Sequence, residues 1–328
     1  MNKQLAIWKL IAGSLQMQIQ VLLLYVLESS GSSPGRQGFF MAVANGGPSA
    51  PLRMEGSIGG GVMEYKFVEM AKEKLRVASL ELRETSIKKQ FHDKLAAANQ
   101  SGMICSGEQT VLLYIIHPDE AAYIQKIISC LQQNKNGTLT LSPKGIQFDN
   151  GMPENNFEFS MKSEEDWLYK EKIGYKNELF IIGGGHCALA FSKLMRSMDF
   201  YIRLYEERKD LKTMIENDSV HEKYFVADYK VLNELIPSGN NHYVVIMTFG
   251  YRTDDVALRA LLNKEFKYLG LLGSKSKIEK LFTDYHKEGI PKERLQQIHT
   301  PIGISIKSQT PEEIAVSIAA EIIRVKNS

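Results

Sequence analysis

Apolar residues in the first half of the chain recur with two different periods. Segments with helical spacing alternate with short strand-like runs, and clusters of Gly, Asn, Pro and Ser separate them. This mixture predicts a mixed α/β domain over residues 1–172. The elements expected there are helices over 5–14, 62–75 and 119–133, strands over 19–27, 39–44, 138–149 and 156–170, and a glycine-rich loop over 54–61.

The pattern changes near residue 177. Over residues 177–328, strand-like apolar runs alternate with amphipathic helices, which predicts an α/β domain built on a doubly wound parallel sheet. The final helix, expected over 311–325, has the clearest start signal, because Thr310 can cap it and Glu313 completes a capping box. The strands expected in this domain are 179–182, 200–205, 223–226, 243–247 and 268–272.

Charge and hydropathy exclude two classes of partner. The formal net charge of the 328 residues is +2, and basic and acidic residues are mixed along the chain, so no basic stripe is available for nucleic acid. The most apolar run, residues 21–27, is much shorter than the roughly 20 residues that span a bilayer. It also lacks the flanks of a signal peptide, so we expect neither a nucleic-acid partner nor a membrane partner.

The three cysteines, Cys105, Cys130 and Cys187, are widely spaced. An odd number with no CxxC pair gives neither a disulfide framework nor a zinc-site spacing. We therefore expect a protein of the reducing cytoplasm and no bound metal of its own.

One glycine motif has the context that dinucleotide binding requires. Gly183 and Gly185 follow a predicted strand, a helix follows them, and Glu206 ends the next strand about 20 residues later. Glycines let backbone N–H groups approach a phosphate, and the helix N-terminus carries partial positive charge. The motif predicts a Rossmann-like fold and makes NAD(P) a candidate cofactor, although a turn kept for packing alone would have the same sequence.

Two side chains beside this motif have two interpretations each. His186 either touches a ligand or has a structural role at the turn. Arg208 either contacts a phosphate or forms a solvated ion pair with Glu206 or Glu207.

Further candidate motifs lie in the first half. Ser32 and Ser33 precede a proline, the segment Gly56–Gly61 ends in three glycines with Glu64 beyond them, and Cys105 stands beside a serine and a glycine. Bare backbone before a helix suits an anionic or planar ligand. A tight connection, and a cysteine buried as a small apolar residue, are the alternatives.

Two motifs end predicted strands of the second half. One is Thr248 with Phe249, and the other is Gly273 with Ser274 and Lys275. The carboxyl ends of parallel strands are where open sheets bind ligands. A helix cap with a solvated lysine explains Ser274 and Lys275 equally well.

In their order, these motifs resemble the xanthine dehydrogenase accessory factor family, also called XdhC/CoxI, over nearly the whole chain. Cys105-Ser106-Gly107 stands where such proteins usually read Cys-Gly-Gly. The resemblance implies a homodimeric chaperone that binds the molybdenum cofactor (molybdopterin) as cargo. It also implies that the chaperone supports sulfuration of the cofactor and inserts it into xanthine dehydrogenase or a related molybdenum hydroxylase.

Two departures from the family pattern bear on mechanism. Val62 stands where the family often has a cysteine, and Phe249 where it often has a histidine, which leaves Cys105 as the candidate thiol ligand. The alternatives are an NAD(P)-dependent oxidoreductase and a scaffold that only docks a hydroxylase. The residues expected to contact the cofactor are Ser32, Ser33, Gly56, Ser57, Gly59, Gly60, Gly61, Glu64, Gly183, Gly185, His186, Glu206, Arg208, Thr248, Gly273, Ser274 and Lys275.

Overall fold

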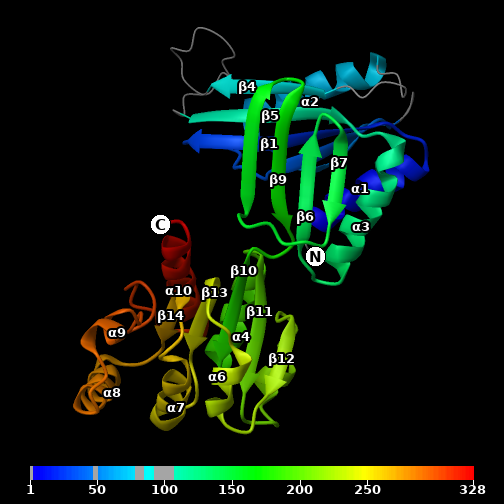
Figure 1. Ribbon diagram of the computed structural model, residues 1–328. Helices are drawn as coiled ribbons and strands as arrows, with labels where there is room; N and C mark the ends of the chain where they lie inside the picture. The colour runs from blue at the N-terminus through cyan, green and yellow to red at the C-terminus, as the bar shows by residue number, and fades with distance from the viewer. Residues whose placement is uncertain (1–2, 47–50, 78–84, 92–106) are drawn as a thin grey trace. The chain divides into compact units, whose positions relative to one another are not determined.

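The computed structural model describes residues 3–46, 51–77, 85–91 and 107–328, and divides the chain into two compact units (Figure 1). The N-terminal unit is Met1–Gly174 and the C-terminal unit is Tyr175–Ser328. Each has its own apolar core, so each is described by itself.

The N-terminal unit contains two antiparallel sheets. The first has the strand order β3-β2-β1-β5-β4 and the second the order β7-β6-β9-β8. The strands are β1 (Val21–Gly31), β2 (Phe40–Ala44), β3 (Arg53–Gly56), β4 (Thr85–Phe91), β5 (Gly107–Ile115), β6 (Gly137–Ser142), β7 (Gly145–Asp149), β8 (Phe157–Ser163) and β9 (Asp166–Ile173), and the helices are α1 (Lys3–Gln16), α2 (Gly61–Val77), the short 3-10 helix η1 (Pro118–Glu120) and α3 (Ala121–Gln132).

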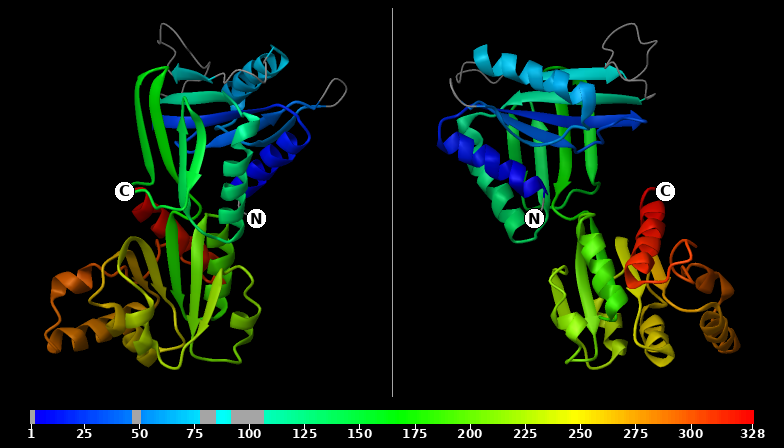
Figure 2. Two further views of the ribbon diagram at one scale, coloured as in Figure 1. Left: turned by 45° about the vertical axis from the view of Figure 1, so that its right-hand side comes forward. Right: turned by 180° about the vertical axis from the view of Figure 1, so that it is seen from behind.

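Strand β1 lies at the centre of this unit, and its position explains its unbroken apolar run. Leu22 and Leu24 face Met63 and Phe67 of α2, whereas Leu23 and its alternate neighbours face α1, α3 and the second sheet. The two views of Figure 2 show α2 on one side of the first sheet and α1 with α3 on the other. A strand buried on both faces has no polar alternation.

The C-terminal unit is a five-stranded parallel sheet with the order β12-β11-β10-β13-β14. Helices cover both faces, as the doubly wound prediction requires, so the predicted fold class is confirmed. The strands are β10 (Asn177–Ile182), β11 (Phe200–Glu206), β12 (Glu222–Phe225), β13 (Gly239–Ile246) and β14 (Phe266–Leu271), and the helices are α4 (His186–Arg196), α5 (Lys212–Ile215), η2 (Tyr229–Val231), α6 (Leu232–Leu235), α7 (Tyr251–Leu261), α8 (Lys275–Lys287), α9 (Lys292–Gln296) and α10 (Pro311–Lys326).

The two faces of the parallel sheet have separate cores. Helices α4 and α10 pack against one face, and α6, α7 and α8 against the other. The predicted start of α10 is confirmed, because Thr310 Oγ1 accepts a hydrogen bond from the Glu313 N–H at 3.2 Å. On one side of β10 the sheet continues with β11 and then β12. The next strands in the chain, β13 and β14, lie on the other side of β10. The switch point therefore lies between β10 and β13.

The hydropathy pattern misses or shortens several strands of the N-terminal unit. It does not predict strand β4, since this strand is polar and half-exposed along most of its length. It predicts an end of β1 at residue 27, but the strand continues to Gly31, because Glu28–Gly31 pair with β5 beyond an irregularity in register. Backbone pairing without side-chain burial leaves little signal in a hydropathy pattern.

Among the described residues, no helix has the length and apolar character needed to cross a membrane.

Candidate functional site

The glycine turn after β10 is held by contacts that only glycine permits. The Gly183 N–H donates to the Tyr205 carbonyl at 2.8 Å, and the Gly183 φ of +100° lies in the left-handed region. A Cβ at Gly183 would lie 2.4 Å from the carbonyl oxygen of Met247, at the end of β13. The turn is therefore wedged into the switch point between β10 and β13.

Two helices begin at this switch point with a glycine as the N-cap residue. Gly185 precedes α4 and Gly250 precedes α7, and neither has a side chain to cap its helix. A Cβ built on either glycine would meet nothing within 4 Å. The first N–H groups of an α-helix have no partner inside the helix, so these two open ends suit an anionic group. The carboxyl-end edge of the sheet at the switch point, where open α/β sheets bind ligands, is called the Rossmann crevice below.

Glu206, the acid of the predicted fingerprint, is 1% exposed and accepts several hydrogen bonds. The Gly184 N–H donates to it at 2.7 Å, and the Glu207 and Arg208 N–H groups each donate at 3.0 Å. The Arg208 guanidinium adds bonds from Nε at 2.9 Å and Nη2 at 2.8 Å. Although burial alone opposes ionisation, these donors hold the pKa of Glu206 below its usual range.

Of the two interpretations of Arg208, the structure shows an ion pair, and its partner is Glu206. Glu207 instead accepts the Tyr229 N–H at 3.0 Å. The pair is open to solvent only on the arginine side, where the side chain is 40% exposed. The guanidinium carbon of Arg208 also lies 5.2 Å from the ring centre of Phe249, which is 83% exposed. This contact joins the loop after β11 to the loop after β13.

A buried network supports Thr248 on the other side of the crevice. Asp254 of α7 accepts the Thr248 hydroxyl at 2.6 Å and the Thr248 N–H at 3.1 Å. Lys277 of α8 forms an ion pair with Asp254 and donates to the Leu272 carbonyl at 3.3 Å. Asp254 and Lys277 follow the motifs at the ends of two predicted strands, but nothing in the sequence alone pairs them with each other.

The last candidate residues of this unit have ordinary structural surroundings. Ser274 is the N-cap residue of α8 and accepts the Lys277 N–H at 3.4 Å, whereas Lys275 is exposed. This arrangement favours the interpretation of Ser274 as a helix cap and of Lys275 as a solvated lysine. His186 is exposed at the first position of α4.

The glycine loop of the N-terminal unit is also held by a glutamate. One oxygen of Glu64, in the first turn of α2, accepts the Ser57 hydroxyl at 2.6 Å, the Ile58 N–H at 2.9 Å and the Gly60 N–H at 3.0 Å. The carboxylate therefore fixes the path of the loop from β3 into α2.

Three separate segments meet at this loop. A Cβ at Gly59 would lie 2.4 Å from the Gly35 nitrogen, and one at Gly107 would lie 2.6 Å from the Ser33 nitrogen. Gln109, which is buried on β5, donates to the Gly35 carbonyl at 2.9 Å and to the Ile58 carbonyl at 3.3 Å. The segments 32–35, 56–64 and 107–109 are called the glycine platform below.

The glycine platform contains the candidate residues of the first half that the structure describes. Ser33 is buried and donates to the Gly35 carbonyl at 3.0 Å, whereas Ser32 is exposed. Val62, at the position of the missing family cysteine, is 56% exposed. Cys105 lies outside the described residues. No motif in the sequence marks Gln109 as part of this site.

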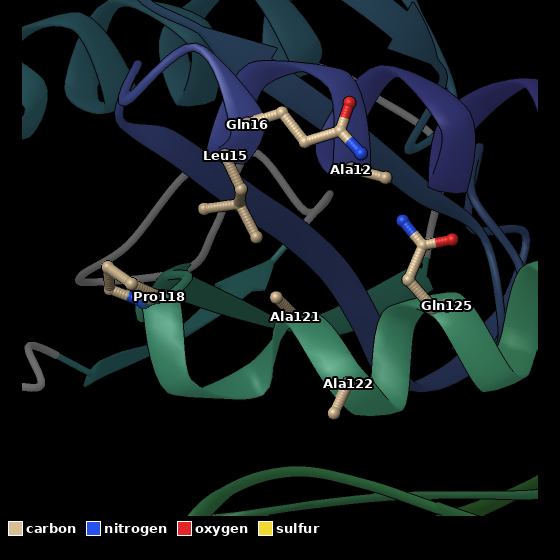
Figure 3. A pocket seen from close by; sticks show the side chains of 7 residues that line it. All are labelled: Ala12, Leu15, Gln16, Pro118, Ala121, Ala122 and Gln125. Carbon is tan, nitrogen blue, oxygen red and sulfur yellow. The ribbon is translucent and has the colours of Figure 1, made fainter.

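A separate hollow of about 300 Å³ lies between α1 and α3 (Figure 3). Its lining is largely apolar and includes Leu15, Pro118 and Ala121. No predicted site residue lines it. Among the described residues, no group of three or more His, Cys, Asp or Glu side chains is arranged to hold a metal ion.

The chain is similar to known proteins over parts of its sequence and, in its fold, over its whole length. The model of the XdhC Rossmann domain matches residues 179–322. An uncharacterized protein, YqeB, of Escherichia coli K12 is 30% identical over 159 residues, which are 47% of this chain and 28% of that protein. A probable xanthine dehydrogenase component of Bacillus subtilis 168 is 33% identical over 82 residues, 25% of this chain and 23% of that protein. The matches thus span less than a third of each curated relative.

A solved structure extends the similarity to both units. The crystal structure of a xanthine dehydrogenase from Bacillus halodurans has a TM-score of 0.70 to this chain and covers 100% of it, with 96% of that chain covered in return. At 21% identity, this likeness concerns the fold. The family-model match therefore identifies residues 179–322 as an XdhC Rossmann domain, and the solved structure extends the similarity of fold to the whole chain.

Proposed function

We propose that this protein is a cytoplasmic accessory factor that binds the molybdenum cofactor as cargo, supports its sulfuration and inserts it into a xanthine-dehydrogenase-type molybdenum hydroxylase. The observation that carries the proposal is the glycine platform. Three segments far apart in the sequence meet there, and Gly35, Gly59 and Gly107 leave no space for side chains between them.

The chemistry of the platform suits the cargo. The cofactor is a pterin dithiolene with a phosphate group, so the exposed Ser32, the open face of the backbone at Gly60, where a Cβ would meet nothing within 4 Å, and a thiol are appropriate partners. Cys105 lies two residues before Gly107 in sequence and is the thiol that the proposal assigns to the metal-dithiolene end. Because valine occupies position 62, the proposed mechanism uses one cysteine.

The test is retention of the cargo by the purified full chain. The protein is incubated with molybdenum cofactor released from a donor enzyme, and pterin and molybdenum are quantified in the gel-filtration peak. We expect near-stoichiometric retention, and a large loss of both after Cys105→Ser. The matched control is Cys187→Ser, because Cys187 is a half-buried thiol on α4 of the other unit.

Each result has a definite meaning. No retention by the wild-type chain would contradict the cargo proposal itself. Retention that Cys105→Ser leaves unchanged would remove the thiol from the mechanism but keep the chaperone. Light scattering on the same peak measures whether the chain is the homodimer that we propose, and addition of a cofactor-free hydroxylase measures delivery.

The Rossmann crevice favours a second candidate, an NAD(P)-dependent oxidoreductase. Its open helix ends at Gly185 and Gly250 suit the phosphates of a dinucleotide. Turnover of NAD(P)H with a small carbonyl substrate, measured as loss of absorbance of the reduced nicotinamide, would favour an enzyme over a chaperone.

A further inference from the structure

The acid of the Rossmann fingerprint has no acceptor left for a ribose. In NAD-binding domains the acid at the end of the second strand accepts the ribose 2′-hydroxyl. A carboxylate has about four lone-pair sites. In Glu206 these sites face the N–H groups of Gly184, Glu207 and Arg208 and two nitrogens of the Arg208 guanidinium. A ribose diol would therefore have to displace Arg208 from a buried carboxylate.

Arg208 itself has donors available. A guanidinium has five N–H donors in a planar fork, and the bonds to Glu206 use Nε and Nη2. The Nη1 atom can therefore donate to another acceptor on the solvent-accessible side of the Arg208 side chain. The contact with the Phe249 ring at 5.2 Å restricts the plane of the guanidinium. Glu206 thus orients an arginine at the place where the fold receives a ribose 2′-substituent.

The guanidinium of Arg208 is the group that suits a phosphate at that place. Beyond the end of β11, Arg208 and the exposed Lys209 lie between the acids Glu207 and Asp210, so these four residues together have no net charge and it is the oriented arginine that favours a phosphate. An arginine near this position is the feature that accommodates a 2′-phosphate in Rossmann folds. The open Gly185 turn would hold the pyrophosphate of the same ligand.

We propose that the Rossmann crevice is a binding site for NADP(H) that discriminates against NAD(H), with Arg208 as the specificity-determining residue and Glu206 as its positioning residue. This inference rests on the second candidate function, nicotinamide nucleotide binding in the Rossmann crevice, whereas the cargo proposal is carried by the glycine platform of the N-terminal unit. It requires only binding, and no redox step is included.

The experiment is a fluorescence titration of the full chain with NADPH and with NADH. A charge-assisted contact to the 2′-phosphate predicts about tenfold tighter binding of NADPH, or more. The pair adenosine 2′,5′-bisphosphate and AMP repeats the comparison without nicotinamide, and competition with NADPH should favour the bisphosphate by a similar factor. Because the members of each pair differ only in the 2′-phosphate, the difference in affinity isolates that group.

Variants assign the effect to Arg208. Arg208→Ala should abolish the preference by weakening NADPH binding, and Arg208→Lys should retain part of it. The control is Arg196→Ala, which removes an exposed arginine at the far end of α4. Circular dichroism of each variant identifies a loss that comes from unfolding, and Arg208→Lys is informative even if Arg208→Ala does not fold.

Three results would overturn the proposal. They are equal affinity for NADPH and NADH, no binding of either nucleotide at millimolar concentration, and a preference that survives Arg208→Ala in folded protein. If Arg208 instead contacts the phosphate of the pterin cargo, Arg208→Ala will reduce cofactor retention while NADPH does not bind. That outcome would leave the cargo proposal standing and this one contradicted.

Discussion

The two glycine loops of the protein are stabilised by the same device in two different settings. Each loop leads from a strand into a helix, and in each a glutamate accepts backbone N–H donors of the loop, two in the platform loop and one, from Gly184, in the Rossmann loop. Glu64 comes from the helix that its own loop enters, four residues after Gly60. Glu206 comes from a neighbouring strand, 22 residues after Gly184, and has an arginine beside it.

This difference separates local from tertiary stabilisation. Glu64 is half-buried and can exchange its bonds with water, whereas Glu206 is buried and its bonds tie β10 to β11. Loss of a buried acceptor leaves donors without partners, and loss of an accessible one does not. The Rossmann loop should therefore depend far more on its glutamate and its glycines than the platform loop does.

The two units can be followed separately, because both tryptophans, Trp8 and Trp167, lie in the N-terminal unit. Tryptophan fluorescence reports unfolding of that unit alone, whereas far-ultraviolet circular dichroism reports both. A substitution in the Rossmann domain should shift the dichroism transition and leave the fluorescence transition in place.

The largest expected effect is that of Gly183→Ala. An alanine there has a positive φ and a Cβ 2.4 Å from the Met247 carbonyl oxygen, so the strand ends must move apart. We expect destabilisation of the Rossmann domain by about 3 kcal/mol in urea unfolding followed by dichroism. Gly185→Ala is the control, since its φ of −70° is ordinary and its Cβ meets nothing within 4 Å. Equal effects of the two variants would contradict the wedge at the switch point.

The next effect is that of Glu206→Ala. It removes the acceptor of the Gly184 N–H and leaves Arg208 without its carboxylate, but the half-exposed arginine can turn to solvent. Because solvent can take over part of the ion pair, we expect the free energy of unfolding, measured by dichroism, to fall by about 2 kcal/mol. Glu216→Ala, an exposed acid of the same unit, should cost a few tenths of a kcal/mol at most. A Glu206→Ala protein as stable as wild type would show that water replaces the carboxylate.

The parts of this site that sequence could predict are those defined by neighbouring residues. Gly183, Gly185 and Glu206 follow a spacing that the fold imposes, so the strand, turn and acid were all located correctly. Gln109 donates a hydrogen bond to Gly35, which lies 74 residues earlier in the sequence. Lys277 pairs with Asp254, which lies 23 residues earlier. A side chain whose partner is brought close only by folding has no local pattern, which is why the sequence does not predict these contacts.

The pH dependence should carry the signature of Glu206. Its pKa is lowered in the folded state, so the stabilisation is present above the ordinary value of 4.5 and is lost as the pH falls through the folded pKa. The free energy of unfolding of the wild-type Rossmann domain, measured by dichroism, should therefore fall from about pH 5 downward. The fall should be smaller than the loss caused by Glu206→Ala. Glu206→Gln should flatten this part of the profile. An unchanged profile would mean that other carboxylates determine acid unfolding.

The smallest expected effect is that of Glu64→Ala, and it tests the local side of the comparison. Removing the carboxylate frees the Ser57 hydroxyl and the Ile58 and Gly60 N–H groups, but the loop is open enough for water to replace it. We expect the free energy of unfolding, measured by tryptophan fluorescence, to fall by about 1 kcal/mol, which is similar to the effect of removing a helix cap. The dichroism change of the Rossmann domain should be unaffected.

Glu69→Ala is the matched control on the same helix, because Glu69 forms a solvent-accessible ion pair with Lys72 at 2.5 Å, and such a pair contributes about 0.3 kcal/mol. A Glu64→Ala protein that unfolds like Glu69→Ala but retains less cofactor would assign Glu64 to the cargo. One that is less stable but retains the cofactor would assign it to the loop. Because Glu64 already accepts three donors of the platform, we expect the second result.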